Sequence, residues 1–87
     1  MMAEKGFGQV LLDECIKMGA REVAKELRLT FVFYRIIWKE AEKQWYADVE
    51  FHDNEGRADG VFAADRNRIK VRRELSKKLG ERGRAEQ

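Results

Sequence analysis

The sequence has one cysteine, one histidine and no proline in 87 residues, and each low count excludes some kinds of structure or chemistry. The single thiol, Cys15, cannot form an intramolecular disulfide, so we expect a protein of a reducing intracellular compartment, the cytoplasm. Serine and threonine are limited to Ser76 and Thr30, which together with the absence of proline argues against linkers. No apolar run approaches the roughly 18 residues of a membrane span and no secretory signal is visible, so we expect a soluble protein without a membrane partner.

The same scarcity leaves few side-chain combinations suited to catalysis. His52 and Cys15 lie 37 positions apart, which is not the spacing of a metal site or of a nucleophile–base pair. Asp48 and Glu50 share one face of a predicted strand, but a solvated sheet surface explains such carboxylates. Residues 6–8 (GFG) have neither the spacing nor the preceding strand of a phosphate-binding loop. We therefore expect no enzymatic activity, no metal and no cofactor.

The composition is sufficient for one folded domain. Hydrophobic residues make up 44% of the chain and aromatic residues 10%, enough for a packed core. A chain of 87 residues corresponds to a single domain, and we expect an ordered core over about residues 9–80 with loose termini. Because small domains bury a smaller fraction of their surface, a partner or a second copy would add stability.

The hydrophobic pattern predicts an α+β domain that begins with a helix and continues into a strand. From Gln9 to Leu27 apolar residues recur at helical spacing, and we expect one continuous helix with Cys15 and Gly19 on its packed arc. Leu29 to Trp38 is dense in aromatic and β-branched residues on both faces, which predicts a strand that is central or covered on both sides. Alternation along this strand places Leu29, Phe31, Phe33 and Ile37 on one face and Val32, Tyr34, Ile36 and Trp38 on the other.

Two more strands and a second helix are expected to follow. From Trp45 to His52 apolar and polar residues alternate, which predicts a strand with one face in the core. Asp53 to Gly56 favours a hairpin turn before a third strand from about Arg57 to Ala63. Asp65 suits the N-cap of a last helix that ends near Gly80. The predicted fold is α-β-β-β-α, with a three-stranded antiparallel sheet packed against helices.

Charge is distributed unevenly along the chain. Residues 1–64 hold nine Lys/Arg and twelve Asp/Glu, a net of −3, whereas residues 65–87 hold nine and four, a net of +5. At about 100° per residue the last helix presents a row of cations opposite an apolar arc that includes Ile69. The cations in this row are Arg66, Lys70, Arg73 and Lys77. Such a row suits phosphate groups, so the sequence predicts a nucleic-acid-binding surface.

The element order and two short segments resemble the double-stranded RNA-binding domain. Residues 11–17 (LLDECIK) are similar to the Leu-Leu-x-Glu of that family's first helix, and residues 65–70 (DRNRIK) to the Ser-Lys-Lys-x-Ala-Lys that begins its second helix. The resemblance implies that Glu14 contacts the RNA minor groove and that Ile69 takes the place of a buried alanine. It also implies phosphate contacts by Arg66, Asn67 and Lys70.

The chain departs from that family at three places. Residues Ala20–Leu27 lengthen the first helix, and the connection Lys39–Gln44 lacks the Gly-Pro-x-His that enters the next minor groove. Asn67 replaces a lysine. Losing the loop removes one of the regions that together span about 16 bp of duplex, so the fold can be shared without the RNA function. The expected partner is accordingly duplex RNA or duplex DNA.

Two other interpretations remain open. Residues Glu22–Thr30 are similar to the middle of a helix-turn-helix, which would make Thr30–Trp38 a recognition helix with Arg28 at the turn position usually held by glycine. Alternatively, an aromatic and acidic face of the sheet forms an interface with another protein or with a second copy, as an interaction or inhibitor module. The aromatic residues concerned are Phe31, Phe33, Tyr34, Trp38, Trp45 and Tyr46, and the acidic ones are Asp48, Glu50, Asp53 and Glu55.

Overall fold

A computed structural model describes residues 7–85, which form two helices and three strands. The elements are α1 (Phe7–Leu27), β1 (Thr30–Lys39), β2 (Gln44–His52), β3 (Ala58–Asp65) and α2 (Arg68–Ala85). The strands form one antiparallel sheet in the order β1-β2-β3. The predicted α+β fold is confirmed, and α1 is one continuous helix. Of the termini expected to be loose, residues 1–6 and 86–87 lie outside the described residues, whereas residues 7–8 and 81–85 are helical.

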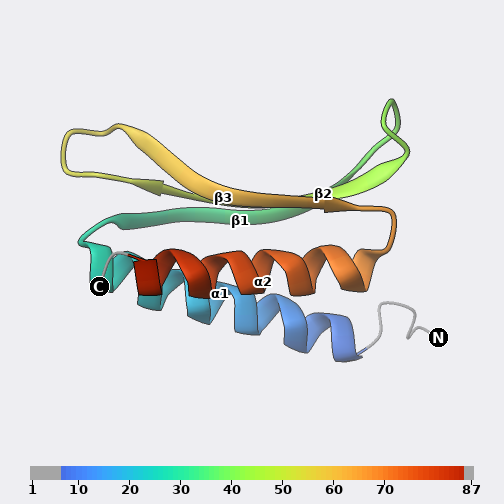
Figure 1. Ribbon diagram of the computed structural model, residues 1–87, viewed down its shortest axis with the longest axis horizontal. Helices are drawn as coiled ribbons and strands as arrows, with labels where there is room; N and C mark the ends of the chain where they lie inside the picture. The colour runs from blue at the N-terminus through green and yellow to red at the C-terminus, as the bar shows by residue number, and fades with distance from the viewer. Residues whose placement is uncertain (1–6, 86–87) are drawn as a thin grey trace.

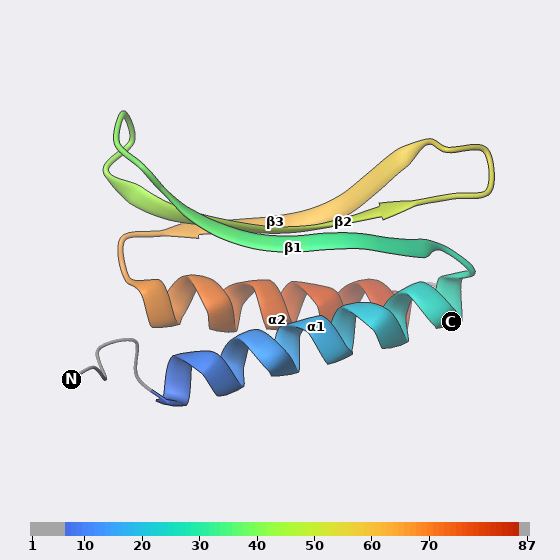
Figure 2. The same cartoon turned by 180° about the vertical axis from the view of Figure 1, so that it is seen from behind.

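The domain has two layers, because both helices lie on the same face of the sheet (Figures 1 and 2). The two helices run in the same direction. Nothing within residues 7–85 covers the other face of the sheet, which we call the outer face. Neither helix in this part of the chain is long and apolar enough to cross a membrane. The core between the layers consists of Ile16, Ala20, Val23, Ala24, Ala47, Val49, Phe51, Ala63, Val71, Leu75 and Leu79.

Strand β2 is the centre of the sheet, and its alternating sequence decides which face is buried. Ala47, Val49 and Phe51 are at most 1% exposed and point toward the helices, whereas the intervening Asp48 and Glu50 point to the outer face. The predicted orientation of this strand is confirmed. Burying its apolar side chains is worth about 1.5–3 kcal/mol for each of the larger ones, which fixes the register of the sheet.

Strand β1 does not alternate regularly, contrary to the sequence prediction. The pairing with β2 shifts between Phe31 and Phe33, so Val32 occupies a bulge. Phe31 faces Phe51 on the helix side, but after the bulge Tyr34 and its even-numbered successors take that side instead. Phe33 and Phe31, predicted to share a face, therefore lie on opposite faces. Strand β1 is also an edge strand covered on one face only, not a central one.

The interpretation of Thr30–Trp38 as a recognition helix is wrong, because these residues lie in β1. The turn before them ends α1 instead. Arg28 has φ 59°, its N–H donates to the Lys25 carbonyl at 3.3 Å, and the Leu29 N–H donates to the Ala24 carbonyl at 2.8 Å. This pair of hydrogen bonds is the Schellman arrangement that terminates helices. The chain then enters β1 directly.

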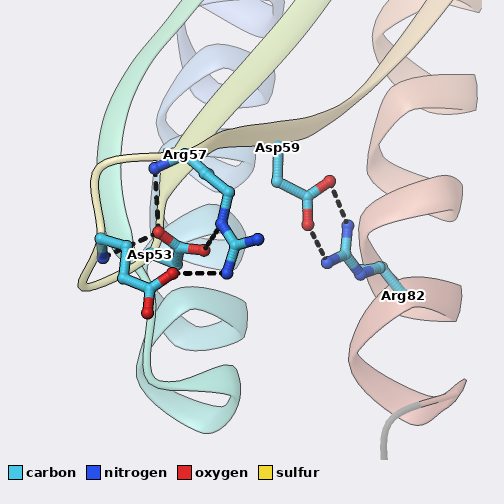
Figure 3. A network of polar contacts seen from close by, with 5 residues as sticks. Asp53, Arg57, Asp59 and Arg82 are labelled. Carbon is cyan, nitrogen blue, oxygen red and sulfur yellow. Dashed lines mark hydrogen bonds and ion pairs between the residues drawn. The ribbon is translucent and has the colours of Figure 1, made fainter.

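The turn between β2 and β3 is held by Asp53. Its carboxylate accepts hydrogen bonds from the backbone N–H groups of Glu55 and Arg57, each at 2.9 Å, and Gly56 takes the left-handed φ of 82° that the turn requires. Figure 3 shows the Arg57 guanidinium folded back onto Asp53, and nearby the Asp59 carboxylate of β3 facing Arg82 of α2. The Asp59–Arg82 ion pair links the far half of α2 to the sheet.

Two glycines in regular elements differ in the space around them, which gives a test of the β2–β3 pairing. A Cβ at Gly60 would lie 2.2 Å from the Val49 carbonyl oxygen, whereas a Cβ at Gly19 of α1 would meet nothing within 4 Å. Gly60→Ala should therefore lower the free energy of unfolding by about 1–3 kcal/mol, the usual cost of overpacking. Gly19→Ala should raise it by about 0.5–1 kcal/mol, because alanine favours helices.

Chemical denaturation of the two variants and the parent protein measures both effects. Equal effects of the two substitutions would show that the close backbone approach at Gly60 is absent in solution.

Candidate nucleic-acid interface

Helix α2 has a buried side and an opposite, charged side. Val71, Leu75 and Leu79 are at most 2% exposed and pack into the core. At about 100° per residue, four cations lie within an arc about 60° wide on the side facing away from these residues. We call them the cationic stripe: Lys70, Arg73, Lys77 and Arg84, all exposed. The core packing of α2 thus sets the direction in which the stripe points.

The four cations of the stripe have no carboxylate partners among the described residues. Within residues 7–85, the side chains of Lys70, Arg73, Lys77 and Arg84 make no hydrogen bond or ion pair. Six other cations each pair with a carboxylate: Lys17, Arg35, Lys43, Arg57, Arg72 and Arg82. Other described cations also lack a carboxylate partner: Arg21, Lys25, Arg28, Lys39, Arg66, Arg68 and Lys78. The stripe differs from these because four such charges are aligned on one side of a single helix, where they are available to an anionic ligand.

Helix α2 begins two residues later than the position of Asp65 predicted. The side-chain oxygen of Asn67 accepts hydrogen bonds from the N–H groups of Ile69 and Lys70, both at 2.9 Å, so Asn67 is the N-cap. Asp65 instead accepts a hydrogen bond from the Asn67 N–H at 2.8 Å and shapes the preceding turn. Arg66 is exposed but lies before the helix, so helical periodicity does not place it in the stripe.

Helix α2 also continues past its predicted end at Gly80, to Ala85. The extension packs against α1: Gly83 is buried, and a Cβ there would lie 3.4 Å from Cγ2 of Val23. A glycine in a helix costs only about 1 kcal/mol, which such packing can offset. The extra turn brings Arg84 into the stripe, a residue that a helix ending at Gly80 could not include.

Neither Ile69 nor Glu14 lies where the resemblance to the double-stranded RNA-binding domain implies, Ile69 in the core and Glu14 together with the cations of α2. Ile69 is 40% exposed, so its predicted place in the core is wrong. Glu14 lies on the exposed side of α1 and pairs with Lys17 at 3.5 Å, and it makes no hydrogen bond or ion pair with α2 in the described residues. Cys15, expected on the packed arc of α1, is exposed. The structure therefore brings together the cations of α2 but not Glu14.

A buried polar cluster, missed by the sequence analysis, joins α1, β1 and α2. The Asp13 carboxylate accepts hydrogen bonds from the Tyr34 hydroxyl at 2.5 Å and from Nε of Arg72 at 2.7 Å. Arg72 also donates to the Arg68 carbonyl at 3.2 Å, and its side chain is only 7% exposed. Helical geometry already contained the signal, because Arg72 falls about 20° from Leu79 on the apolar side of the helix.

The cluster shifts the pKa values of both acidic groups. Burial raises the pKa of the Asp13 carboxyl, but the hydrogen bonds and charge of Arg72 and the hydrogen bond from Tyr34 outweigh it, so this pKa lies below the usual value. Burial and the hydrogen bond to Asp13 together raise the pKa of the Tyr34 hydroxyl well above its usual range. Both shifts favour the observed state, an ionised Asp13 held by a neutral tyrosine and a charged arginine.

The outer face of the sheet is the second large surface with a distinct character. Tyr46 and Phe62 stack there with ring centroids 5.5 Å apart, and Lys39 lies 4.2 Å from the Tyr46 ring. Arg35 donates from Nε to Asp48 at 2.9 Å, and Glu50 pairs with His52 at 2.7 Å. A shallow hollow of 280 Å³ lies over β3, lined by residues that include Tyr46, Asp48, Glu50, Ala58, Gly60 and Phe62. Both signs of charge are present on this face.

In the part of the chain that the structure describes, no group of three or more His, Cys, Asp and Glu side chains is arranged to hold a metal ion. No protein-family model matches the chain, and neither a curated protein nor a solved structure matches it. The assignment of function therefore rests on the surfaces described above.

The Asp13–Arg72 pair predicts a specific pH dependence of stability. Because the pKa of Asp13 is lowered in the folded state, its contribution is fully present above the unfolded-state pKa of about 3.9 and is lost as pH falls through the folded-state value. Asp13→Asn should cost about 2 kcal/mol at neutral pH, less than the roughly 3–5 kcal/mol of a fully buried pair, because the carboxylate is 27% exposed. The difference in free energy of unfolding between the parent protein and the Asp13→Asn variant should narrow below about pH 4.

Denaturant unfolding at a series of pH values measures this difference. Asp48→Asn, which breaks the more exposed pair with Arg35, serves as the control and should cost less. A gap between parent and Asp13→Asn that stays constant down to low pH would contradict the account.

Proposed function

We propose that this chain is a non-enzymatic nucleic-acid-binding domain that holds a duplex through the cationic stripe of α2. The observation that carries the proposal is the alignment of Lys70, Arg73, Lys77 and Arg84 on one exposed side of α2, where none of them has a carboxylate partner among the described residues. A cation already paired with a carboxylate gains less from a phosphate, whereas a solvated one releases the counterions of the phosphate it neutralises.

The length of the stripe is comparable with a binding site on a duplex. Lys70 and Arg84 are 14 residues apart in one helix, which corresponds to about 21 Å at about 1.5 Å per residue. Successive phosphates of one strand rise by about 3.4 Å along the duplex axis, so the stripe has the axial length of about six base-pair steps. Contacts of this kind position a protein on a duplex but carry no base sequence.

The arrangement of elements is a further support. The element order resembles the double-stranded RNA-binding domain, and the N-terminal ends of both helices and the β1–β2 turn lie at the same end of the domain (Figure 1). Arg66 and the N-cap Asn67 belong to that end. By the resemblance, Arg66, Asn67 and Lys70 contact phosphates and Glu14 contacts the minor groove. A reducing, cytoplasmic location inferred from the single cysteine is compatible with such a partner.

The β1–β2 turn is expected to contribute less to binding than the corresponding loop of the double-stranded RNA-binding domain. Glu40 accepts a hydrogen bond from Nε1 of Trp38 at 2.8 Å and pairs with Lys43, so the polar groups of the turn bind one another. The Gly-Pro-x-His that the family inserts into a minor groove is absent here. We therefore propose binding that depends mainly on the backbone charge of the duplex, with α2 as the principal contact.

The proposal predicts steep salt dependence that the stripe controls. The chain should bind a duplex of about 20 bp, and log affinity should fall linearly with log salt, by about 0.9 for each phosphate neutralised on a B-form duplex. Replacing Lys70, Arg73 and Lys77 together by Gln should weaken binding about tenfold or more at low salt and lower that slope by about 2–3. Fluorescence anisotropy of labelled duplex RNA and duplex DNA across a salt series measures both quantities.

The matched control removes the same number of charges elsewhere. Lys25 lies in the last turn of α1, Arg28 follows that helix and Arg57 precedes β3, and replacing all three by Gln also lowers the net charge by three. This variant should retain most of the affinity and slope. Equal losses in the two triple variants would mean that net charge alone drives binding, and no binding at low salt would remove the proposal.

Arg84 gives a separate test of the helix extension. If α2 continues through Gly83 to Ala85, Arg84 lies in line with the rest of the stripe, and Arg84→Gln should weaken duplex binding and reduce the salt slope by about 1. If the helix ended at Gly80, the Arg84 side chain would have no fixed direction. Arg84→Gln would then have no defined effect on the slope of log affinity against log salt. Glu81→Gln in the same turn, which removes an anion, should instead strengthen binding slightly.

A further inference from the structure

A hollow lies at the end of the domain where both helices begin and the β1–β2 turn is found (Figure 1). Its volume is 270 Å³, and its walls come from α1, β2 and α2. The lining residues are Gln9, Val10, Asp13, Trp45, Arg68 and Arg72. Pockets for drug-sized ligands have volumes of about 300–1,000 Å³. This hollow therefore suits one small planar group, not a large ligand.

The wall of the hollow on the sheet side is aromatic. Trp45 is half-buried, and its partner in the register, Trp38 of β1, meets it edge-on with ring centroids 5.5 Å apart. Trp38 is 42% exposed, so the pair extends an aromatic surface from the edge of the core to the open end of the sheet. Nucleobases stack on such surfaces whatever their identity, because every base has a π face.

Polar groups of both helices surround this aromatic wall. The guanidinium carbon of Arg68 lies 5.5 Å from the Trp45 ring centroid, and Arg68 has no carboxylate partner in the described residues. The side-chain amide of the half-buried Gln9 makes no hydrogen bond within residues 7–85. Asp13 and Arg72, by contrast, bind each other. The hollow thus offers an amide with donors and an acceptor, and a guanidinium suited to stacking or to phosphate.

From the juxtaposition of the Trp45 ring, the Gln9 amide and the Arg68 guanidinium, we propose that the hollow holds one unpaired nucleotide of the bound nucleic acid, at an end or a bulge of the duplex. The base stacks on the aromatic wall, its polar edge meets Gln9, and its phosphate contacts Arg68. This inference rests on the nucleic-acid-binding function proposed above. It adds a preference for unpaired nucleotides, which phosphate contacts along the stripe do not supply.

The hollow and the cationic stripe are close enough for one strand to reach both. Arg68 and Lys70 lie two residues apart in the first turn of α2 and, at about 100° per residue, point to roughly opposite sides of the helix. A helix with its side chains is about 10–12 Å wide, which equals about three phosphate spacings of about 3.4 Å. The nearby row of cations favours a nucleotide over an aromatic side chain of a protein, because the nucleotide brings a phosphate to Arg68.

Titration of the full chain with mononucleotides tests the hollow without a duplex. In a Trp38→Phe variant, Trp45 is the only tryptophan of the chain, so tryptophan fluorescence reports on the hollow alone. We expect saturable quenching by nucleoside 5′-monophosphates, with a dissociation constant on the order of 1 mM, because a single stacked base and one charged contact bind weakly. Ribose 5-phosphate, which lacks the base, should cause no quenching.

Two substitutions in the same background locate the binding site. Gln9→Ala and Arg68→Gln should each weaken nucleotide binding about threefold to tenfold, as expected for the loss of one polar contact. The matched control is Arg21→Gln, which removes a cation that also lies 5.5 Å from a ring centroid, that of Phe31, outside the hollow. This control should bind nucleotides as the parent background does. Circular dichroism confirms that each variant is folded, which is expected because none of these three residues belongs to the core.

Several results would overturn the proposal. They are the absence of saturable quenching by any of the nucleotides, equal quenching by ribose 5-phosphate, and unchanged affinity in both hollow variants. Tighter binding of N-acetylphenylalanine amide than of the nucleotides would indicate a protein side chain as the occupant and would also overturn it.

The parent chain gives the link to the duplex. A short single-stranded overhang should strengthen duplex binding about fivefold or more, the lower end of what one stacked base contributes, and equal affinity for blunt and overhanging duplexes overturns the proposal. Nucleotide binding without duplex binding would refute only the assignment of the stripe. Duplex binding without nucleotide binding would refute only the assignment of the hollow.

Discussion

The buried ion pair between Asp13 and Arg72 is the interaction on which the geometry of the helical layer depends. Nε of Arg72 lies 2.7 Å from the Asp13 carboxylate, which also accepts the Tyr34 hydroxyl, so one carboxylate joins α1, β1 and α2. Leaving an arginine that is only 7% exposed without a partner is costly. Helix α2 is therefore constrained in rotation about its axis, which turns Lys70 and Arg73, the neighbours of the Val71–Arg72 pair, toward solvent.

The one-sided covering of the sheet gives the domain two surfaces with different physical properties. The surface of α2 presents four aligned cations that lack carboxylate partners in the described residues, and this is the basis for proposing a duplex as ligand. The outer face of the sheet is mixed in charge, because Arg35 and Lys39 of β1 lie beside Asp48 and Glu50 of β2. It lies on the opposite side of the domain from the helices (Figures 1 and 2).

The parts of the fold that were predictable have strong local patterns. Strict alternation predicted the buried face of β2, and the Asp53–Gly56 turn was predicted because Asp and Gly have specific roles in tight turns. The parts that failed depend on contacts distant in sequence. The end of α2 was misplaced because Gly80 resembles a terminator, whereas packing of Gly83 against α1 continues the helix. The bulge at Val32 has no signature in an apolar run.

The candidate site was predictable only in part, for the same reason. Periodicity alone placed Lys70, Arg73 and Lys77 on one exposed side of a helix, but it included Arg66, which precedes the helix, and omitted Arg84. The choice between Asp65 and Asn67 as N-cap depends on the path of the chain leaving β3, which the sequence does not specify. The sequence analysis did not single out Arg72, because its partner Asp13 is 59 residues away.

The central claim is that the cationic stripe of α2, and not the outer face of the sheet, contacts nucleic acid. The most direct measurement is a nuclear magnetic resonance titration of the isotope-labelled chain with a duplex of about 20 bp, long enough for a site of about 16 bp. The account predicts that the largest shift changes occur at Lys70, Arg73, Lys77 and Arg84, with little change at Phe33, Ile37 and Phe62. Changes concentrated on the outer face, with α2 unaffected, would contradict it.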